Sequence, residues 1–267
     1  MRRPKPLKAV RLAWLSMKLG ALNAVQYRAD FAIALVQSFI GLVTSIGTVS
    51  IVFAQTQTLG GWTRDELVAL IGVFFIVGGL VSVVVRPSME RLMEGVRRGT
   101  LDFDLTKPAD AQVLVSTRAV DIWRLIDVGV GIVVLGVAIG RMGGQVGLER
   151  ALAFGVLLIA GLAIIYSFLL ILTTLAFWLV KLENILVIFA TVYEAGKWPI
   201  GIYPPWLRLV LTAVVPIAFA ITVPVETLVG RVDAFAVGAT VLIATAFLLG
   251  SRWFWRRGLR SYTGASA

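Results

Sequence analysis

Four long runs without a charged residue constrain this chain more than any other feature. They lie within residues 31–63, 67–85, 151–180 and 234–251. A helix needs roughly 20 mostly apolar residues to cross the hydrocarbon core of a bilayer, so each run has room for a membrane span. Only 15% of the residues are charged, whereas a typical soluble domain has about 25%. The chain is therefore predicted to be an integral membrane protein, which excludes a soluble domain, a disordered chain and a conventional nucleic-acid binder.

Two further segments are apolar but interrupted. Residues 128–140 are too short to span alone, so the third span is expected to begin near Ala119. Its first two turns would then carry Asp121, Arg124 and Asp127. The other segment, 184–228, contains five of the nine prolines, and proline kinks or breaks a helix. They are Pro199, Pro204, Pro205, Pro216 and Pro224.

The proline-rich segment allows two interpretations. In the first, a short fifth span at 182–197 is followed on the outer side by re-entrant broken helices at 206–215 and 217–228. Such irregular backbone is tolerated at membrane depth only inside protein or beside a water-filled cavity. In the second, residues 209–225 form the fifth span and 184–196 lie at the interface. Both predict an all-α polytopic protein with six transmembrane helices and both termini on one side.

The basic residues are distributed unequally between the two sides. In this topology 19 lysines and arginines lie on the side of the termini and six on the other, which predicts cytoplasmic termini by the positive-inside rule. Residues 1–30 would form a cytoplasmic tail, with an amphipathic interfacial helix at 7–28. Residues 31–251 would form the six-span domain, with a cytoplasmic loop at 86–118 and an outer segment at 198–230. Residues 252–267 would be a basic cytoplasmic tail.

The cytoplasmic loop is expected to contain one amphipathic helix. Pro87 favours a helix start and Gly99 a helix end. Four apolar residues between them follow the spacing of one helix face, and glutamates occupy part of the other face. This face suits docking onto another protein, because methionine adapts its shape; contact with lipid or with the chain's own loops explains it equally well. The residues concerned are Met89, Glu90, Leu92, Met93, Glu94 and Val96.

The residue types exclude several kinds of chemistry. The chain has no cysteine and no histidine, so neither a thiolate metal site nor a histidine base is available. No G-x-x-x-x-G-K-[ST] phosphate loop is present, and we predict no catalytic or metal-binding residue. Ionisable residues within membrane segments are the remaining candidates for a substrate path, although an interfacial ion cluster or headgroup exposure also explains them. They are Arg124, Asp127, Glu194 and Glu226.

Four stretches, in this order, resemble an ABC-2 type transporter permease of the bacterial ABC-2 family transporter proteins. The first is QYRADF at 26–31 and the second is GTLDFDLTKP at 99–108, similar to a "G-x-L-D…L-x-K-P" signature. The third is PIGIYPPWL at 199–207, followed by Val-Pro pairs at 215–216 and 223–224. The last is RSYTGAS at 260–266.

The resemblance implies a transport subunit that is not itself an enzyme. Such permeases work in pairs, identical or related, over ABC ATPase subunits encoded separately, which use ATP and Mg while this chain binds no cofactor. By analogy the loop helix at 87–99 would be the coupling element and the five prolines would form an outer gate. The resemblance also implies an exporter in a prokaryotic cell membrane, with membrane lipid but no nucleic acid as a further partner. The apolar membrane face favours a lipophilic or amphipathic substrate.

Three other classes of membrane protein remain as alternatives. A secondary transporter would be expected to show broken helices in both halves of the chain, and here the prolines gather in one. A non-transporting scaffold would need only the spans and a docking helix. A membrane enzyme is the least favoured, because no cluster of catalytic residues is evident. Close helix approach is also expected at Gly136-x-x-x-Gly140.

Overall fold

The computed structural model describes residues 28–106, 110–143, 146–179 and 184–262. Among these residues five helices are long and apolar enough to cross a membrane, and a bent helix pair makes a sixth if its halves count as one span. The all-helical fold is thus confirmed. The five spans contain α2 (Arg28–Phe53), α3 (Arg64–Leu80), α7 (Leu125–Arg141), α8 (Leu148–Thr174) and α13 (Ala234–Ser261).

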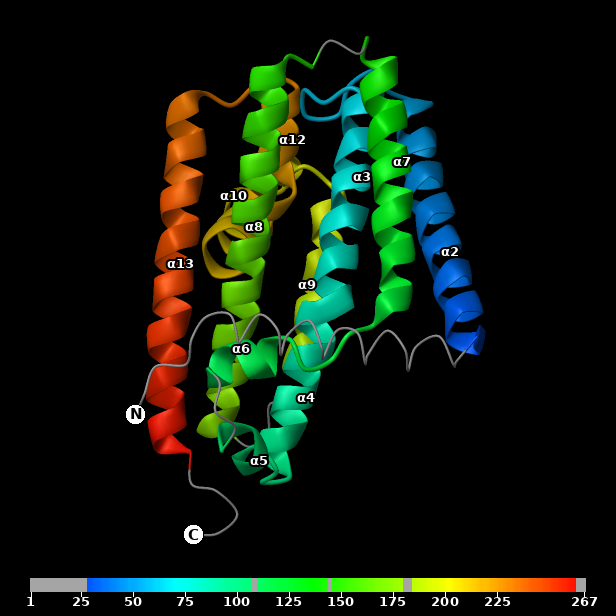
Figure 1. Cartoon of the computed structure of the whole chain (residues 1–267). Coiled ribbons are helices and arrows are strands. Elements are labelled where there is room, and N and C mark those ends of the chain that lie inside the picture. Colours follow the sequence, from blue (N-terminus) through cyan, green and yellow to red (C-terminus); the bar gives the residue numbers. More distant parts are fainter. Residues whose placement is uncertain (1–27, 107–109, 144–145, 180–183, 263–267) are drawn as a thin grey trace.

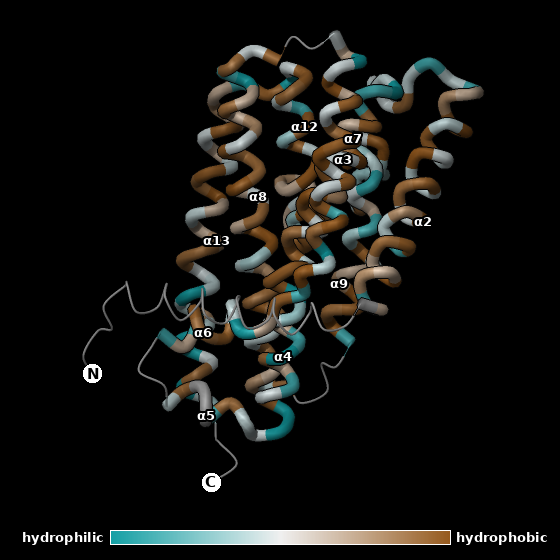
Figure 2. Tube along the Cα trace, turned by 45° about the vertical axis from the view of Figure 1, so that its right-hand side comes forward, coloured by the Kyte–Doolittle hydropathy of each residue, from teal (hydrophilic) through white to brown (hydrophobic). Residues whose placement is uncertain are grey.

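The helices form two packed groups with a short helix between them. Helix α3 packs on α7 and α2, while α8 packs on α13 and on the broken segment before it. Figure 1 shows α9 (Ile185–Tyr193) between the two groups. Hydrophobic residues dominate the middle of the long helices, and hydrophilic residues gather around α4–α6 and at the opposite end (Figure 2). Both ends of the described chain lie at the end that carries α4, which we call the α4 end (Figure 1).

The amphipathic helix expected in the loop is a continuation of the second span. Helix α3 passes through a π-helical turn, Val81–Val85, directly into α4 (Arg86–Arg97). Pro87 has no N–H for the carbonyl of Val83 four residues earlier, and the backbone N–H of Asp121 donates to that carbonyl at 2.8 Å instead. The span and α4 are thus one continuous helix. The carbonyl left free by its proline is paired with a residue from a distant part of the chain.

The contact between Asp121 and Val83 also explains why the third span begins later than predicted. The helix expected from Ala119 begins at Leu125, after a 3-10 turn at Ile122–Arg124. Residues 119–121 bind the α3–α4 helix instead of extending α7. Ala119, for example, exchanges hydrogen bonds with the buried hydroxyl of Ser88 at 3.0 and 3.2 Å. Asp121 and Arg124 therefore precede the α-helix, and only Asp127 lies in its first turn.

The proline-rich segment is broken into short helices. Helix α9 is followed by a 3-10 turn, Glu194–Lys197, and then by two half-helices bent by 70°. The halves run over Pro205–Val214 and Ile217–Leu228. Between them Val215 is extended and Pro216 precedes the second half. The bent pair takes in residues 209–225, and α9 takes in most of 184–196, so the choice between the two interpretations stays a prediction. The first half consists of α10 (Pro205–Leu209) and a π turn, and the second of α11 (Ile217–Ala220) and α12 (Thr222–Leu228).

The last span is longer than its uncharged run. Helix α13 continues through the arginines of the predicted tail to Ser261. Its far part is fixed by packing: Trp255 is buried, and a Cβ at Gly258 would lie 2.6 Å from Thr174. The interfacial helix expected at 7–28 lies almost entirely outside the described residues.

Glycines bring α3 and α7 into backbone contact. A Cβ built on Gly72 would lie 2.7 Å from the backbone nitrogen of Leu135, and one on Gly131 would lie 2.6 Å from the carbonyl oxygen of Gly72. By contrast, a Cβ on Gly136 or Gly140 meets nothing within 4 Å. The close approach expected at Gly136-x-x-x-Gly140 is therefore wrong within this chain, and Gly72 and Gly131 provide it instead.

Alanine substitutions at Gly72 and Gly136 test the glycine contact, because they should change the stability of the fold differently. We expect Gly72→Ala to lower the free energy of unfolding by about 1–3 kcal/mol, because its Cβ forces the two backbones apart. Gly136→Ala is the matched control: it adds helix propensity without a clash, so stability should stay equal or rise by up to about 1 kcal/mol. Thermal melting in detergent, followed by circular dichroism, measures both. Equal melting temperatures for the two variants would contradict this packing.

Candidate functional site

A cavity of about 220 Å³ opens between the two helix groups. Residues of α2, α3, α8 and α9 surround it, together with the start of α7. One wall is aromatic, and its rings come from Phe74, Phe75, Phe189 and Tyr193. Ionisable groups also line it, namely Arg86, Asp127, Glu194 and Lys197. An apolar cavity with a few polar groups is the usual form of a small-molecule site.

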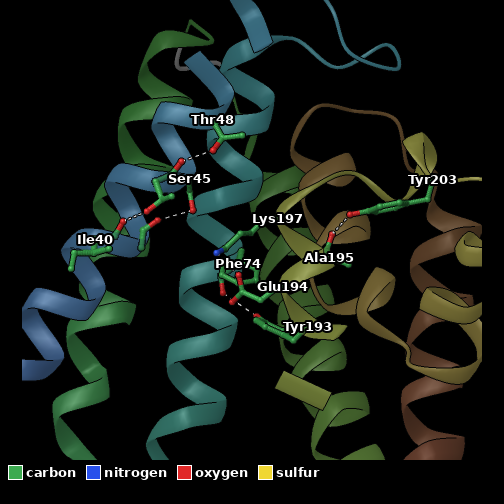
Figure 3. Close-up of polar contacts among 11 residues, drawn as sticks. Ile40, Ser45, Thr48, Phe74, Tyr193, Glu194, Ala195, Lys197 and Tyr203 are labelled. Atoms are coloured by element: carbon green, nitrogen blue, oxygen red, sulfur yellow. Dashed lines mark hydrogen bonds and ion pairs between the residues drawn. The ribbon is translucent and has the colours of Figure 1, made fainter. Parts of the chain in front are cut away.

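An ion pair lies in this cavity, about halfway along the helix that runs from Arg64 to Arg86. The amine of Lys197 donates to the carboxylate of Glu194 and sits 5.1 Å from the centre of the Phe74 ring (Figure 3). Phe74 is ten residues from Arg64 and twelve from Arg86 along one helix, which places it about 15 Å and about 18 Å from those ends. Charges at this depth are costly and mark a functional site by default.

The turn after α9 positions the ion pair. The hydroxyl of Tyr193, which is buried, donates to the carbonyl of Phe74 at 2.9 Å, and the two rings are 4.8 Å apart (Figure 3). Gly78 provides the room, because a Cβ there would lie 3.2 Å from the Tyr193 ring. Tyr203 donates to the carbonyl of Ala195 at 2.9 Å and holds the turn from the other side.

A second group of charges lies at the mouth of the cavity nearer the α4 end. Asp127 accepts a hydrogen bond from the hydroxyl of Ser38, and the guanidinium of Arg124 lies 3.9 Å from its carboxylate. Arg86 is paired with Glu90 at 2.9 Å. Each charged group in the cavity therefore has a partner within the chain.

The structure brings together some of the predicted substrate-path residues and not others. Asp127 and Glu194 line the same cavity, and Arg124 contacts Asp127. Glu226 lies on α12, at the far end of the molecule, and does not line this cavity. That these residues form a substrate path stays a prediction.

A smaller cavity of about 80 Å³ lies on the other side of Lys197. Three hydroxyl side chains of α2 line it, together with Trp198 and Lys197 itself. These hydroxyls bond to carbonyls of their own helix, for example Ser45 to Gly41 at 2.7 Å, and their oxygens remain able to accept hydrogen bonds. Lys197 thus separates an aromatic cavity from a hydroxyl-lined one. The three hydroxyl residues are Thr44, Ser45 and Thr48.

The predicted coupling residues divide into a buried and an exposed set. Met89 and Leu92 are 0% and 3% exposed, and the hydroxyl of Thr173 donates to the sulfur of Met89 at 3.2 Å. Met93 and Val96 are half-buried. The apolar face of α4 therefore packs largely on the chain itself, so the expectation that a partner seats on Met89 and Leu92 is corrected. The side left exposed carries Glu90, Arg91, Glu94, Arg97 and Arg98.

A polar cluster ties the α4 end to two membrane helices. Asp110 caps α6 (Ala111–Ser116) and forms a two-pronged ion pair with Arg252 on α13. Arg252 also donates to Gln112 at 2.8 Å, and Gln112 donates to the hydroxyl of Tyr166 on α8 at 3.1 Å. The hydrogen bonds from Arg252 hold the pKa of Asp110 below its ordinary value. Helix α6 is thus linked to α8 and α13 together.

The predicted gate prolines do not gather at one point. Pro204 and Pro205 start α10 and are exposed, while Pro216 lies buried at the bend and Pro224 buried within α12. Pro199 is buried beside Ile200, whose N–H donates to Thr222 at 3.4 Å. Their role as an outer gate stays a prediction.

Sequence reasoning missed the group at the centre of the site. Lys197 is not among the residues singled out from the sequence, whereas the structure places its amine against the Phe74 ring. An amine inside an apolar run, three residues after a carboxylate and four after a tyrosine, was the signal available. Its partner Phe74 comes from a helix more than 100 residues away, so spacing alone does not connect the two.

Comparison with known proteins points to one family. A family model described as "ABC-2 family transporter protein" matches residues 39–266, which is most of the chain. The match includes every described element from within α2 to the end of α13. No curated protein matches the chain significantly.

The link between α6 and α13 predicts a pH-dependent stability. Because the pKa of Asp110 is depressed in the folded state, its pair adds stability above the ordinary aspartate pKa of about 3.9 and loses it as the pH falls further. Asp110→Asn keeps the helix cap and should lower stability by about 1 kcal/mol at pH 7. Melting in detergent at pH 7 and pH 3 tests this, with Glu149→Gln, exposed at the other end, as control. A difference as large at pH 3 as at pH 7 would refute it.

Proposed function

The chain belongs to the family of ABC-2 transporter proteins, and from this premise we propose that it is the membrane-spanning subunit of an ABC exporter. A separate ABC ATPase would use ATP and Mg, and two permease chains, identical or related, would work together. The substrate would be lipophilic or amphipathic and would pass through the cavity between the two helix groups. The membrane would be a prokaryotic cell membrane.

The observation that carries the proposal is the mid-depth cavity. It combines apolar aromatic walls with an ion pair, Lys197 with Glu194, held between helices of both groups. A scaffold has no use for a charged pair at this depth, because a charge there costs a few kcal/mol at insertion. A path for an amphipathic molecule gives the pair a reason to be retained.

The orientation follows from charge. Among the described residues most arginines lie at the α4 end or just inside it, which supports a cytoplasmic α4 end under the positive-inside rule. The chain ends would then be cytoplasmic, and α4 would face the ATPase. Those arginines are Arg86, Arg91, Arg97, Arg98, Arg118, Arg124, Arg252, Arg256, Arg257 and Arg260.

Coupling would use the exposed side of α4. Because α3, the π turn and α4 are continuous, a displacement of α4 moves Phe74 directly. ATP binding would then shift the population between inward-facing and outward-facing states through its different affinity for the two. The polar cluster of Asp110 and Arg252 would carry the same displacement to α13.

Charge reversal on α4 tests the proposal. The chain is co-expressed with the ABC ATPase of its genomic neighbourhood, purified as a complex and assayed for ATP turnover. We expect Glu94→Arg, exposed and outside the core, to lower turnover or co-purification at least about tenfold, as for a lost interface charge pair. Glu149→Arg, exposed at the opposite end, should leave both unchanged.

Two outcomes would contradict this proposal. If no nucleotide-binding partner co-purifies, a secondary transporter or a scaffold gains support. If Glu149→Arg lowers turnover as much as Glu94→Arg, α4 is not the contact. Thermal melting of both variants separates a lost contact from a lost fold.

A further inference from the structure

The main cavity already holds a cation of its own. The amine of Lys197 lies over the face of the Phe74 ring and against the carboxylate of Glu194. An aromatic face combined with an acid is the arrangement by which proteins recognise ammonium and other soft cations. The side chain of Lys197 is 25% exposed and that of Glu194 is 58% exposed, so the pair is open to the cavity rather than sealed in the core.

We propose that this arrangement is a binding site for lipophilic organic cations and that Lys197 is the tethered cation which such a ligand displaces. The proposal rests on the proposed function, since it names the substrate class of the same cavity. The ligand would place its charge between Phe74 and Glu194 and its apolar groups against the aromatic wall. Tyr193 and Phe189, with ring centres 6.0 Å apart, continue that wall.

The smaller cavity gives the displaced amine a place to go. Lys197 lines both cavities, and the side beyond it presents the hydroxyl oxygens of Thr44, Ser45 and Thr48. An ammonium group needs acceptors for its three N–H bonds, and these hydroxyls provide them without a competing carboxylate. Lys197 would then alternate between Glu194, when the site is empty, and the hydroxyl cluster, when it is filled.

The charges of the cavity favour a cation over an anion. Once Lys197 leaves, Glu194 has no partner among the residues that line the cavity, and Asp127 adds a second carboxylate. Arg86, the other cation of the cavity, is paired with Glu90 at 2.9 Å. A bound anion would lie beside two carboxylates, and a bound cation would restore neutrality.

Equilibrium binding to the isolated chain tests the proposal without any ATPase. The full chain is placed in phosphatidylcholine nanodiscs at pH 7.5, and binding of radiolabelled tetraphenylphosphonium is measured against empty nanodiscs. Tetraphenylborate has nearly the same shape with the opposite charge and serves as the ligand control. We expect saturable binding of the cation and at least about tenfold weaker binding of the anion, as for one lost charge interaction.

Three variants define the site. Glu194→Gln should weaken cation binding about tenfold and Phe74→Leu about threefold to tenfold, since an ion contact and a cation–π contact are lost. Lys197→Met removes the competing amine and should tighten binding about tenfold; a gain of this kind does not arise from misfolding. Glu149→Gln, on the exposed outer end of α8, should change nothing.

The outcomes separate this inference from the function it rests on. Equal binding of the two ions, or weaker binding by Lys197→Met, would overturn the tethered-cation site. If that occurs while Glu94→Arg still lowers ATP turnover, the transporter proposal stands and its substrate is of another class. Cation binding with no ATPase partner would keep the site and overturn the proposed function.

Discussion

A bilayer core offers no water to backbone or side-chain polar groups, and the whole structure is arranged around that constraint. One departure from regular helix, beside Pro87, is matched by a donor from a distant part of the chain. The carbonyl that Pro87 leaves free accepts from Asp121. The extended residue before Pro216 lies in the broken segment that packs against α8. The π turn Val81–Val85 and the 3-10 turn Glu194–Lys197 both contribute residues to the lining of the cavity.

The same constraint explains the pairing of charges. Lys197 with Glu194 and Arg124 with Asp127 are pairs of residues three apart in the sequence, so each cation has a counter-charge close by. Such pairing limits the cost of desolvation, but it does not remove it. Apolar residues in these positions would make the fold more stable, so the presence of the charges indicates a function that needs them.

The parts of the fold set by local pattern were predictable, and the parts set by distant contacts were not. The uncharged runs located α2, α3, α8 and α13, and the prolines located the broken segment, because hydropathy and a missing N–H act within a few residues. The start of α7 was misplaced because Ser88 and Val83, more than 30 residues earlier, bind residues 119–121. The amphipathic pattern of α4 was correct, but pattern alone does not tell whether an apolar face meets a partner or the chain's own α8. The centre of the site was not predicted for the same reason, because the contact between Lys197 and Phe74 joins residues that are far apart in the sequence.

The continuity of α3 with α4 bears on how force reaches the cavity. In a separate coupling helix joined by loops, a displacement is partly absorbed by the joints. Here the only irregularity between α4 and Phe74 is the π turn Val81–Val85. The carbonyl of Val83 in that turn accepts a hydrogen bond from the backbone N–H of Asp121, in the segment that leads into α7. A tilt of α4 would therefore move the Phe74 ring and the start of α7 together, and both line the cavity. Because Gly72 and Gly131 place α3 and α7 in backbone contact, the two helices have little freedom to slide apart, so the motion would open or close the gap toward α8 and α9. That gap is where Lys197 lies.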